Sequence, residues 1–176
     1  MSAFAELILK RRSVRQYTDE PLNPADVKQI MRAALLSPTS KNSRAWEFIL
    51  VEDKTLLKQL SFSKPTGAVF VENCALAIVV VIDTSQSEAY LEDTAITATF
   101  MQLQAEDLDL GSCWVQIHGR QTASGLDSEQ YLRELLNIPS HYAVGCIIAI
   151  GHKVRESKPH NEEKLLWEKL HINQFG

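Results

Sequence analysis

The chain has 176 residues, of which 45% are hydrophobic and 23% charged, and it carries a formal net charge of −4. These values are typical of a globular protein, and the length predicts a single domain over residues 1–176. The acidic balance argues against a nucleic-acid partner, and no apolar run reaches the roughly 20 residues that a membrane helix needs.

Hydrophobic spacing and capping residues predict the elements of the first half. Phe4, Leu7 and Ile8 recur at helical spacing. Asn23 followed by Pro24 is typical of a helix start, because the asparagine caps the helix and proline suits its first position. The expected elements are a helix over 3–10, a helix from 24 that ends at 37–38, a strand over 46–52, a helix capped by Asp53 that ends near 62, and a buried strand over 75–83.

The second half alternates in the same way. We expect a long helix over 90–110 that Gly111 ends, a strand over 112–117, a helix over 128–136 and a strand over 142–150 that ends at Gly151. Four strands separated by helices favour an α/β or α+β layered domain. Large apolar residues recur in the tail over 165–175, which predicts that the tail docks on another surface.

Motifs for several enzyme classes are absent. The sequence has no dinucleotide-binding glycine fingerprint, no phosphate-binding loop and no nucleophile elbow. The five histidines do not show metal-ligand spacing, so no metal site is expected. Cys74, Cys113 and Cys146 lie far apart in apolar surroundings, which predicts reduced core thiols and a cytoplasmic protein.

A basic stretch stands out in this acidic chain. Four cations fall within residues 10–15, Ser13 lies among them, and Tyr17 follows. Arginine can hold a phosphate through paired, charge-assisted hydrogen bonds. A solvated basic face is the alternative interpretation of the same residues.

The segment Arg11-Arg12-Ser13-Val14-Arg15-Gln16-Tyr17, directly after a short helix, resembles the opening motif of the nitroreductase family of FMN-dependent oxidoreductases. The resemblance implies an α+β, three-layer fold with a central mixed or antiparallel sheet flanked by helices, and a C-terminal arm that extends onto a dimer partner. It also implies that Arg11 pairs with the FMN phosphate and that Arg12 and Ser13 contact phosphate or ribityl oxygens. Arg15 would lie at the pyrimidine edge, where a guanidinium stabilises the negative charge of the reduced ring.

Residues 37–48 resemble a second segment of the family, which reaches across the dimer interface to the partner's flavin. Alone, the pattern is also typical of a helix-ending turn that leads into a strand. This chain departs from the family at Arg44, where glutamine is usual, and at Ala45, where proline is usual, so the contact of Arg44 would move to a phosphate or a substrate anion. The cofactor contacts that the resemblance implies in this segment are Pro38, Thr39, Ser40, Asn42 and Arg44.

Residues 110–120 resemble a third segment, whose end passes the central ring of the flavin. The resemblance implies that Gln116, His118 or Gly119 offers a backbone N–H to flavin N5 or O4. Many relatives carry a glutamate at the position of His118. In this chain the histidine would deliver a proton or serve only a structural role. A weaker match over 148–153 implies that Gly151 and Lys153 return to the FMN phosphate, with Lys158 in reserve.

The resemblance predicts a homodimer with two shared flavin sites. The enzyme would pass hydride from NADH or NADPH to flavin N5 and then to a nitroaromatic, quinone or flavin acceptor, in a ping-pong cycle. A metabolite-specific flavoenzyme is one alternative, and a flavin-binding or regulatory dimer without fast turnover is another. Substrate choice is expected to lie in the segments 61–72 and 118–127, neither of which holds a recognisable substrate motif.

Overall fold

The computed structural model describes residues 2–175 and centres on a four-stranded sheet with the order β1-β2-β4-β3. The strands are Trp46–Val51 (β1), Leu76–Asp83 (β2), Leu110–Gln116 (β3) and Tyr142–His152 (β4). Each neighbouring pair is antiparallel, so the sheet is antiparallel rather than mixed. β3 forms one edge of the sheet, and this edge positions the candidate site.

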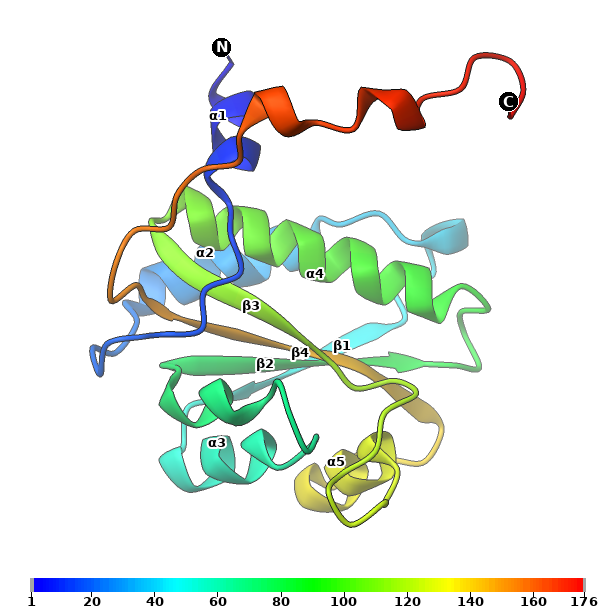
Figure 1. Ribbon diagram of the computed structural model, residues 1–176. Helices are drawn as coiled ribbons and strands as arrows, with labels where there is room; N and C mark the ends of the chain where they lie inside the picture. Colours follow the sequence, from blue (N-terminus) through cyan, green and yellow to red (C-terminus); the bar gives the residue numbers. More distant parts are fainter. Residues whose placement is uncertain (1, 176) are drawn as a thin grey trace.

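Helices cover both faces of the sheet, as the predicted three-layer α+β fold requires (Figure 1). Pro24–Leu35 (α2) and Tyr90–Asp107 (α4) lie on one face, and Lys54–Ser61 (α3) and Ser128–Leu136 (α5) lie on the other. Successive side chains of β2 point to opposite faces of the sheet, and both sets are apolar. Leu76, Ile78 and Val80 join the core under α2 and α4, whereas Ala77, Val79 and Val81 join the core toward α3 and α5.

Two helix starts follow the predicted caps. The Asn23 side chain accepts a hydrogen bond from the Ala25 N–H at 2.9 Å. The Asp53 carboxylate accepts one from the Leu56 N–H at 2.9 Å. Each cap satisfies an N–H that has no partner within the helix, which contributes about 1 kcal/mol to stability.

The predicted end of the long helix is wrong. α4 ends at Asp107, and Asp109 takes the left-handed conformation with φ 60° that was expected of a glycine. Gly111 lies within β3, where an added Cβ would stand 2.7 Å from Cγ1 of Val14. The glycine therefore allows the basic stretch to approach the sheet edge, and the helix ends four residues before it.

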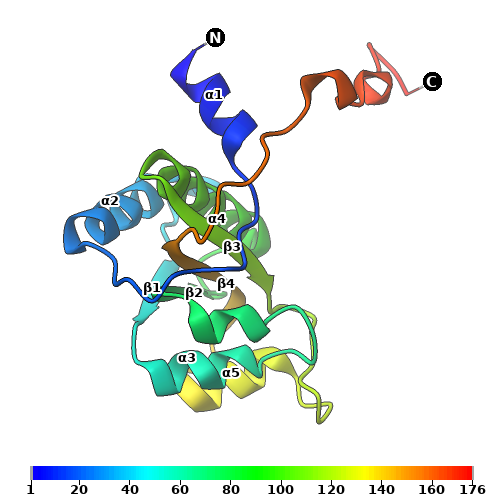
Figure 2. The same ribbon diagram turned by 60° about the vertical axis from the view of Figure 1, so that its left-hand side comes forward.

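The N-terminal segment passes along the β3 edge of the sheet. After Ala3–Lys10 (α1), the Val14 N–H donates to the Ser112 carbonyl at 2.9 Å, and the Thr18 N–H donates to the His152 carbonyl at 3.0 Å. Figure 2 shows α1 and the C-terminal segment projecting from the same end of the molecule. Among residues 2–175, no helix combines the length and the hydropathy needed to cross a membrane.

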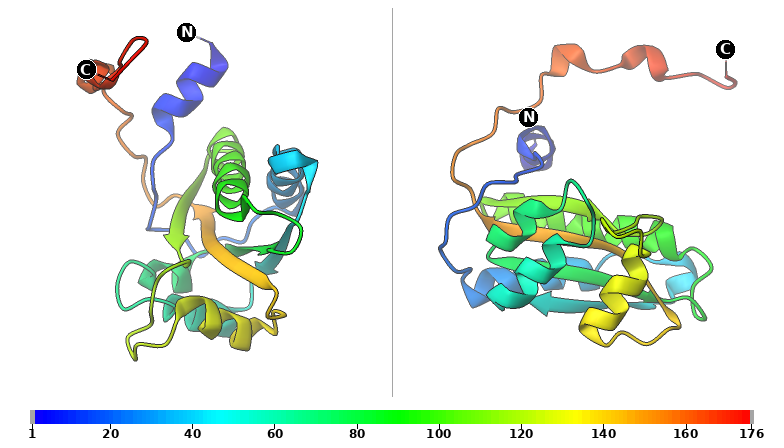
Figure 3. Two further views of the ribbon diagram at one scale, coloured as in Figure 1. Left: turned by 90° about the vertical axis from the view of Figure 1, so that its right-hand side faces the viewer. Right: turned by 60° about the horizontal axis from the view of Figure 1, so that its bottom comes forward.

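The last residues form an arm that leaves the body of the protein (Figure 3). The arm, defined here as residues 161–175, contains the short helices Glu162–Lys164 (η3) and Trp167–Lys169 (η4). Its large apolar side chains are exposed, and Trp167 has 67% and Phe175 90% of its surface accessible. An exposed apolar run of this kind is typical of a segment that packs on another surface.

Candidate functional site

The basic stretch converges with other cations on the middle of β3. Ser13 forms a β-bridge with Ser112, next to Cys113, a buried residue of that strand. Burial raises the pKa of the Cys113 thiol, and the positive charges of Arg15, Lys64 and Arg11 act in the opposite direction. Arg15 also lies over the Phe70 ring, with its Cζ 5.7 Å from the ring centroid. The sheet edge is therefore strongly positive.

The two ends of the chain together form a basic hollow beside this edge. The hollow has a volume of about 380 Å³ and is lined by Arg12, Ser13, Arg155, Glu156, Ser157 and Lys158. A smaller hollow of about 240 Å³, between Arg15 and Arg155, adjoins it. The Arg12 Nη1 donates to the Lys158 carbonyl at 2.8 Å, which fixes the two segments against each other.

These arginines lack anionic partners. Within residues 2–175, no carboxylate oxygen lies within 4.0 Å of the guanidinium nitrogens of Arg11, Arg12, Arg15 or Arg155. A hydroxyl and several unpaired cations around one hollow suit a phosphate, because the ligand would supply the missing negative charge. The residues present therefore fit the phosphate of FMN.

Lys153 and Gly151 have other roles in this structure. The Lys153 ammonium lies 3.0 Å from Glu106 Oε1 and 2.9 Å from Asp109 Oδ1. Burial alone would lower the pKa of Lys153, but the hydrogen bonds to the two carboxylates raise it above its ordinary value. A Cβ at Gly151 would stand 2.9 Å from the Tyr17 ring. Both residues hold the basic stretch on the sheet, whereas Lys158 lines the hollow.

The second motif forms a strained turn that a buried carboxylate anchors. Its short helix Ser40–Asn42 (η1) contains two residues with positive φ, and Arg44 adds a third. The Ser40 N–H donates to Asp93 Oδ1 at 2.8 Å, and the Ser87 hydroxyl donates to Asp93 Oδ2 at 2.7 Å. Non-glycine residues with positive φ cluster at functional sites, where surrounding contacts stabilise them.

Within one chain, the second motif does not meet the first. Figure 1 shows η1 at the right and the basic stretch left of the centre of the molecule, below α1, and Figure 3 shows the same separation. The polar groups of this turn bind one another, since the Arg44 N–H donates to Thr39 Oγ1 at 3.0 Å and the Arg44 Nε donates to Asn42 Oδ1 at 3.1 Å. Pro38 is exposed at the start of the turn. Joint contact of both motifs with one cofactor requires a second chain.

The third motif offers a free backbone donor at Gly119. The side-chain amide of Gln116 donates to the His118 carbonyl at 2.9 Å, and the backbone N–H of His118 donates to the Gly145 carbonyl at 3.3 Å. The Gly119 N–H has no hydrogen-bond partner within residues 2–175, and its φ of +68° favours glycine. The backbone N–H of His118 is therefore occupied, and that of Gly119 remains available to a ligand.

The His118 side chain is held by a buried carboxylate. Its Nδ1 lies 2.6 Å from Glu129 Oε1, and Glu129 Oε2 accepts a hydrogen bond from the Val144 N–H at 2.9 Å. Glu129 is one of the few acidic residues in the core. Sequence reasoning missed it, because Glu129 lies in an ordinary amphipathic helix and the turn of the chain between His118 and α5, which brings the two side chains together, has no sequence signal.

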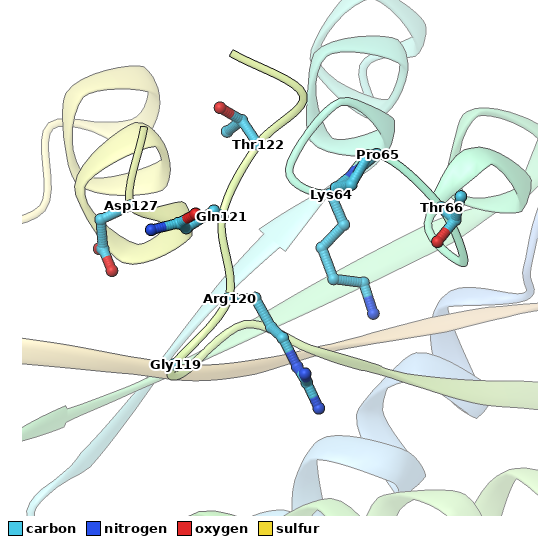
Figure 4. A pocket seen from close by; sticks show the side chains of 8 residues that line it. All are labelled: Lys64, Pro65, Thr66, Gly119, Arg120, Gln121, Thr122 and Asp127. Carbon is cyan, nitrogen blue, oxygen red and sulfur yellow. The ribbon is translucent and has the colours of Figure 1, made fainter. Parts of the chain in front are cut away.

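A larger cavity of about 720 Å³ opens between α3 and α5 (Figure 4). Residues 64–66 line one side of it, and residues 119–122 together with Asp127 line the other. Both groups belong to the segments in which substrate choice was expected to lie. Burial lowers the pKa of Lys64, and the charge of Arg120 lowers it further, so two cations share this space.

Comparisons with known proteins agree on one family. Residues 8–64 and 64–152 match the family model described as "Nitroreductase family". A solved structure, an FMN-dependent nitroreductase from Clostridium difficile, is 42% identical with a TM-score of 0.94, over 96% of this chain and 98% of that chain. A protein of Archaeoglobus fulgidus, provisionally named NADH dehydrogenase/NAD(P)H nitroreductase, is 31% identical over 86% of each chain. An FMN reductase (NADPH) of Bacillus subtilis is 25% identical over 86% of this chain and 66% of its own.

Proposed function

The chain belongs to the nitroreductase family, and on that premise we propose that it is a homodimeric, FMN-dependent oxidoreductase that oxidises NAD(P)H. Its acceptor is a nitroaromatic, a quinone or another flavin, reduced in a ping-pong cycle. The observation that carries this proposal is the group of arginines beside β3 that lack carboxylate partners within residues 2–175. The names of relatives that reduce FMN or nitro compounds with NAD(P)H support it. The three buried thiols fit the cytoplasmic location that we also propose.

The residues of this chain would hold the cofactor at two places. Arg11, Arg12 and Ser13, together with Arg155 and Lys158, would hold the phosphate. Arg15 and the Gly119 N–H would face the ring, where they would neutralise negative charge and donate a hydrogen bond. When bound, FMN supplies the two-electron chemistry that no side chain provides. Lys153 is not among the proposed ligands, because carboxylates already occupy its ammonium group.

A dimer would complete this site. The turn over residues 38–44 lies far from the basic stretch of its own chain, so its proposed contacts are with the partner's flavin. Two apolar features fit such an assembly. One is the exposed arm, and the other is a groove of about 470 Å³ between α1 and α4, lined mainly by Phe4, Leu7, Phe100 and Leu103.

Arg15→Ala should lower the reduction potential of bound FMN by about 30–60 mV, because a hydrogen bond to a charged group contributes about 1.5–3 kcal/mol and about 30 mV corresponds to 1.4 kcal/mol for two electrons. The potential falls because the substitution removes a cation that stabilises the reduced ring more than the oxidised ring. Anaerobic spectroelectrochemistry measures the potential. The reduction potential of FMN bound to Arg15→Lys, which keeps the charge, should stay closer to that of the unsubstituted protein. An unchanged potential in Arg15→Ala with FMN still bound would contradict this role.

The visible absorption spectrum tests the function directly. The purified protein, supplied with FMN, should show a flavin spectrum that bleaches on anaerobic addition of NADPH or NADH and recovers on addition of a nitroaromatic or quinone. A bound flavin that neither nucleotide bleaches would instead favour a flavin-binding dimer. A protein that retains no FMN would show that the basic stretch is a solvated face.

A further inference from the structure

Two cations from separate segments face one cavity. Lys64 follows α3, and Arg120 follows β3, 56 positions later in the chain (120 minus 64). Figure 4 shows the Lys64 and Arg120 side chains extending in the same direction from the two sides of the cavity. The two charges act on each other, since the Arg120 charge adds to the effect of burial in lowering the pKa of Lys64.

Neither cation is neutralised by the protein. In the part of the chain that the structure describes, no carboxylate oxygen lies within 4.0 Å of either side chain. The acidic residue that lines the cavity, Asp127, is the N-cap of α5 and accepts the Gln130 N–H at 2.9 Å. Two positive charges held close together without a counter-charge destabilise each other, and an anion between them removes that penalty.

We propose that Lys64 and Arg120 form an anion subsite for the phosphate or carboxylate group of the molecule that exchanges electrons at this site. The proposal rests on the proposed function and names the class of substrate. Lys64 supplies a compact charge with three donors, and Arg120 supplies a planar fork that can bind two oxygens at once. Gly119, whose N–H is proposed to face the flavin ring, lines the same cavity, so the subsite would adjoin the flavin. The anionic group belongs either to the donor, as the 2′-phosphate of NADPH, or to an acidic acceptor.

Matched pairs of probes distinguish these two sources. Stopped-flow reduction of the FMN-loaded protein compares NADPH with NADH, and its reoxidation compares p-nitrobenzoate with nitrobenzene. Lys64→Gln and Arg120→Gln should each weaken the apparent affinity for NADPH or for p-nitrobenzoate, the members with the additional anionic group, by about tenfold, the effect of losing one charge-assisted hydrogen bond. The apparent affinity for NADH or for nitrobenzene, which lack that group, should change by less than about twofold. Added salt should weaken the binding of p-nitrobenzoate but not that of the neutral nitrobenzene.

Lys58→Gln is the matched control, because it removes an exposed cation of α3 that does not line the cavity. It should behave as the unsubstituted protein with every probe. A loss of affinity confined to NADPH indicates that the anionic group belongs to the electron donor. A loss of affinity confined to p-nitrobenzoate indicates that it belongs to the acceptor. Equal effects on both members of each pair would overturn the subsite. So would weaker FMN binding in Lys64→Gln and Arg120→Gln, since the cations would then belong to the cofactor site.

Failure of the proposed function is seen separately, as a bound flavin that neither nucleotide bleaches or as a protein that retains no FMN. Calorimetric titration with p-nitrobenzoate and nitrobenzene then decides the subsite without turnover. Tighter binding of the anion, weakened about tenfold by Lys64→Gln, would support the subsite. Equal binding of the two probes, or no binding of either, would overturn it.

Discussion

A chain that ends at His160 should be monomeric and should bind FMN at least about tenfold more weakly than the full chain, since a tenfold change corresponds to about 1.4 kcal/mol. Removal of the arm takes away Leu166, Trp167, Ile172 and Phe175, all of which are exposed on the single chain. It leaves the basic hollow, including Arg155 and Lys158, and the hydrogen bond from the His160 N–H to the Leu9 carbonyl. Light scattering measures the assembly, and fluorescence titration measures FMN affinity.

The shortened chain should keep its fold, because the backbone hydrogen bonds after residue 161 join neighbours within the arm. Circular dichroism checks this point. In the full-length chain, the double substitution Trp167→Glu and Leu170→Glu tests the same interface by adding charge to it. A shortened chain that remains dimeric and binds FMN normally would contradict the role proposed for the arm.

Arg11→Ala should raise the dissociation constant of FMN by about 10- to 100-fold, the range expected for losing a hydrogen bond between two charged groups. Arg11 is half-buried at the end of α1, and its charge reaches the Cys113 thiol on β3. No carboxylate within residues 2–175 competes for its guanidinium group. Equilibrium titration of the apoprotein, followed by the quenching of flavin fluorescence, measures the constant.

Lys10→Ala provides the control, because Lys10 is an exposed cation of the same basic stretch and is not placed at the phosphate. It should change the dissociation constant by less than about twofold, as expected for a solvent-screened charge. Equal and small effects of the two substitutions would indicate that the stretch acts only as a solvated basic face.

Local signals predicted most of the fold. The caps at Asn23 and Asp53 fixed the starts of α2 and α3, since a capping side chain acts on N–H groups only two or three residues away. The continuous apolar run of β2 identified a strand buried on both faces. The end of α4 was misplaced, because the need for Gly111 arises from Val14, a residue that is distant in the sequence.

The candidate site depends more on distant contacts, which sequence patterns cannot reveal. The sequence pattern predicts Lys153 as a phosphate ligand, but its ammonium group binds the carboxylates of Glu106 and Asp109, which lie more than forty positions away in the chain. Asp93 of α4 is buried despite its charge. The carboxylate is buried because it binds Ser40 and Ser87. Lys64 and Arg120 carry no mutual sequence signal, and only the fold brings them together.

The hydrogen bond between Arg12 and Lys158 has a consequence for how the protein is made. It joins residues 146 positions apart, and contacts of such long separation form late because a very long loop must close first. A ribosome releases residue 12 long before it has added residue 158. The nascent chain therefore cannot close the basic hollow, and if the hollow holds the FMN phosphate as proposed, the newly made protein would acquire FMN only after its synthesis is nearly complete.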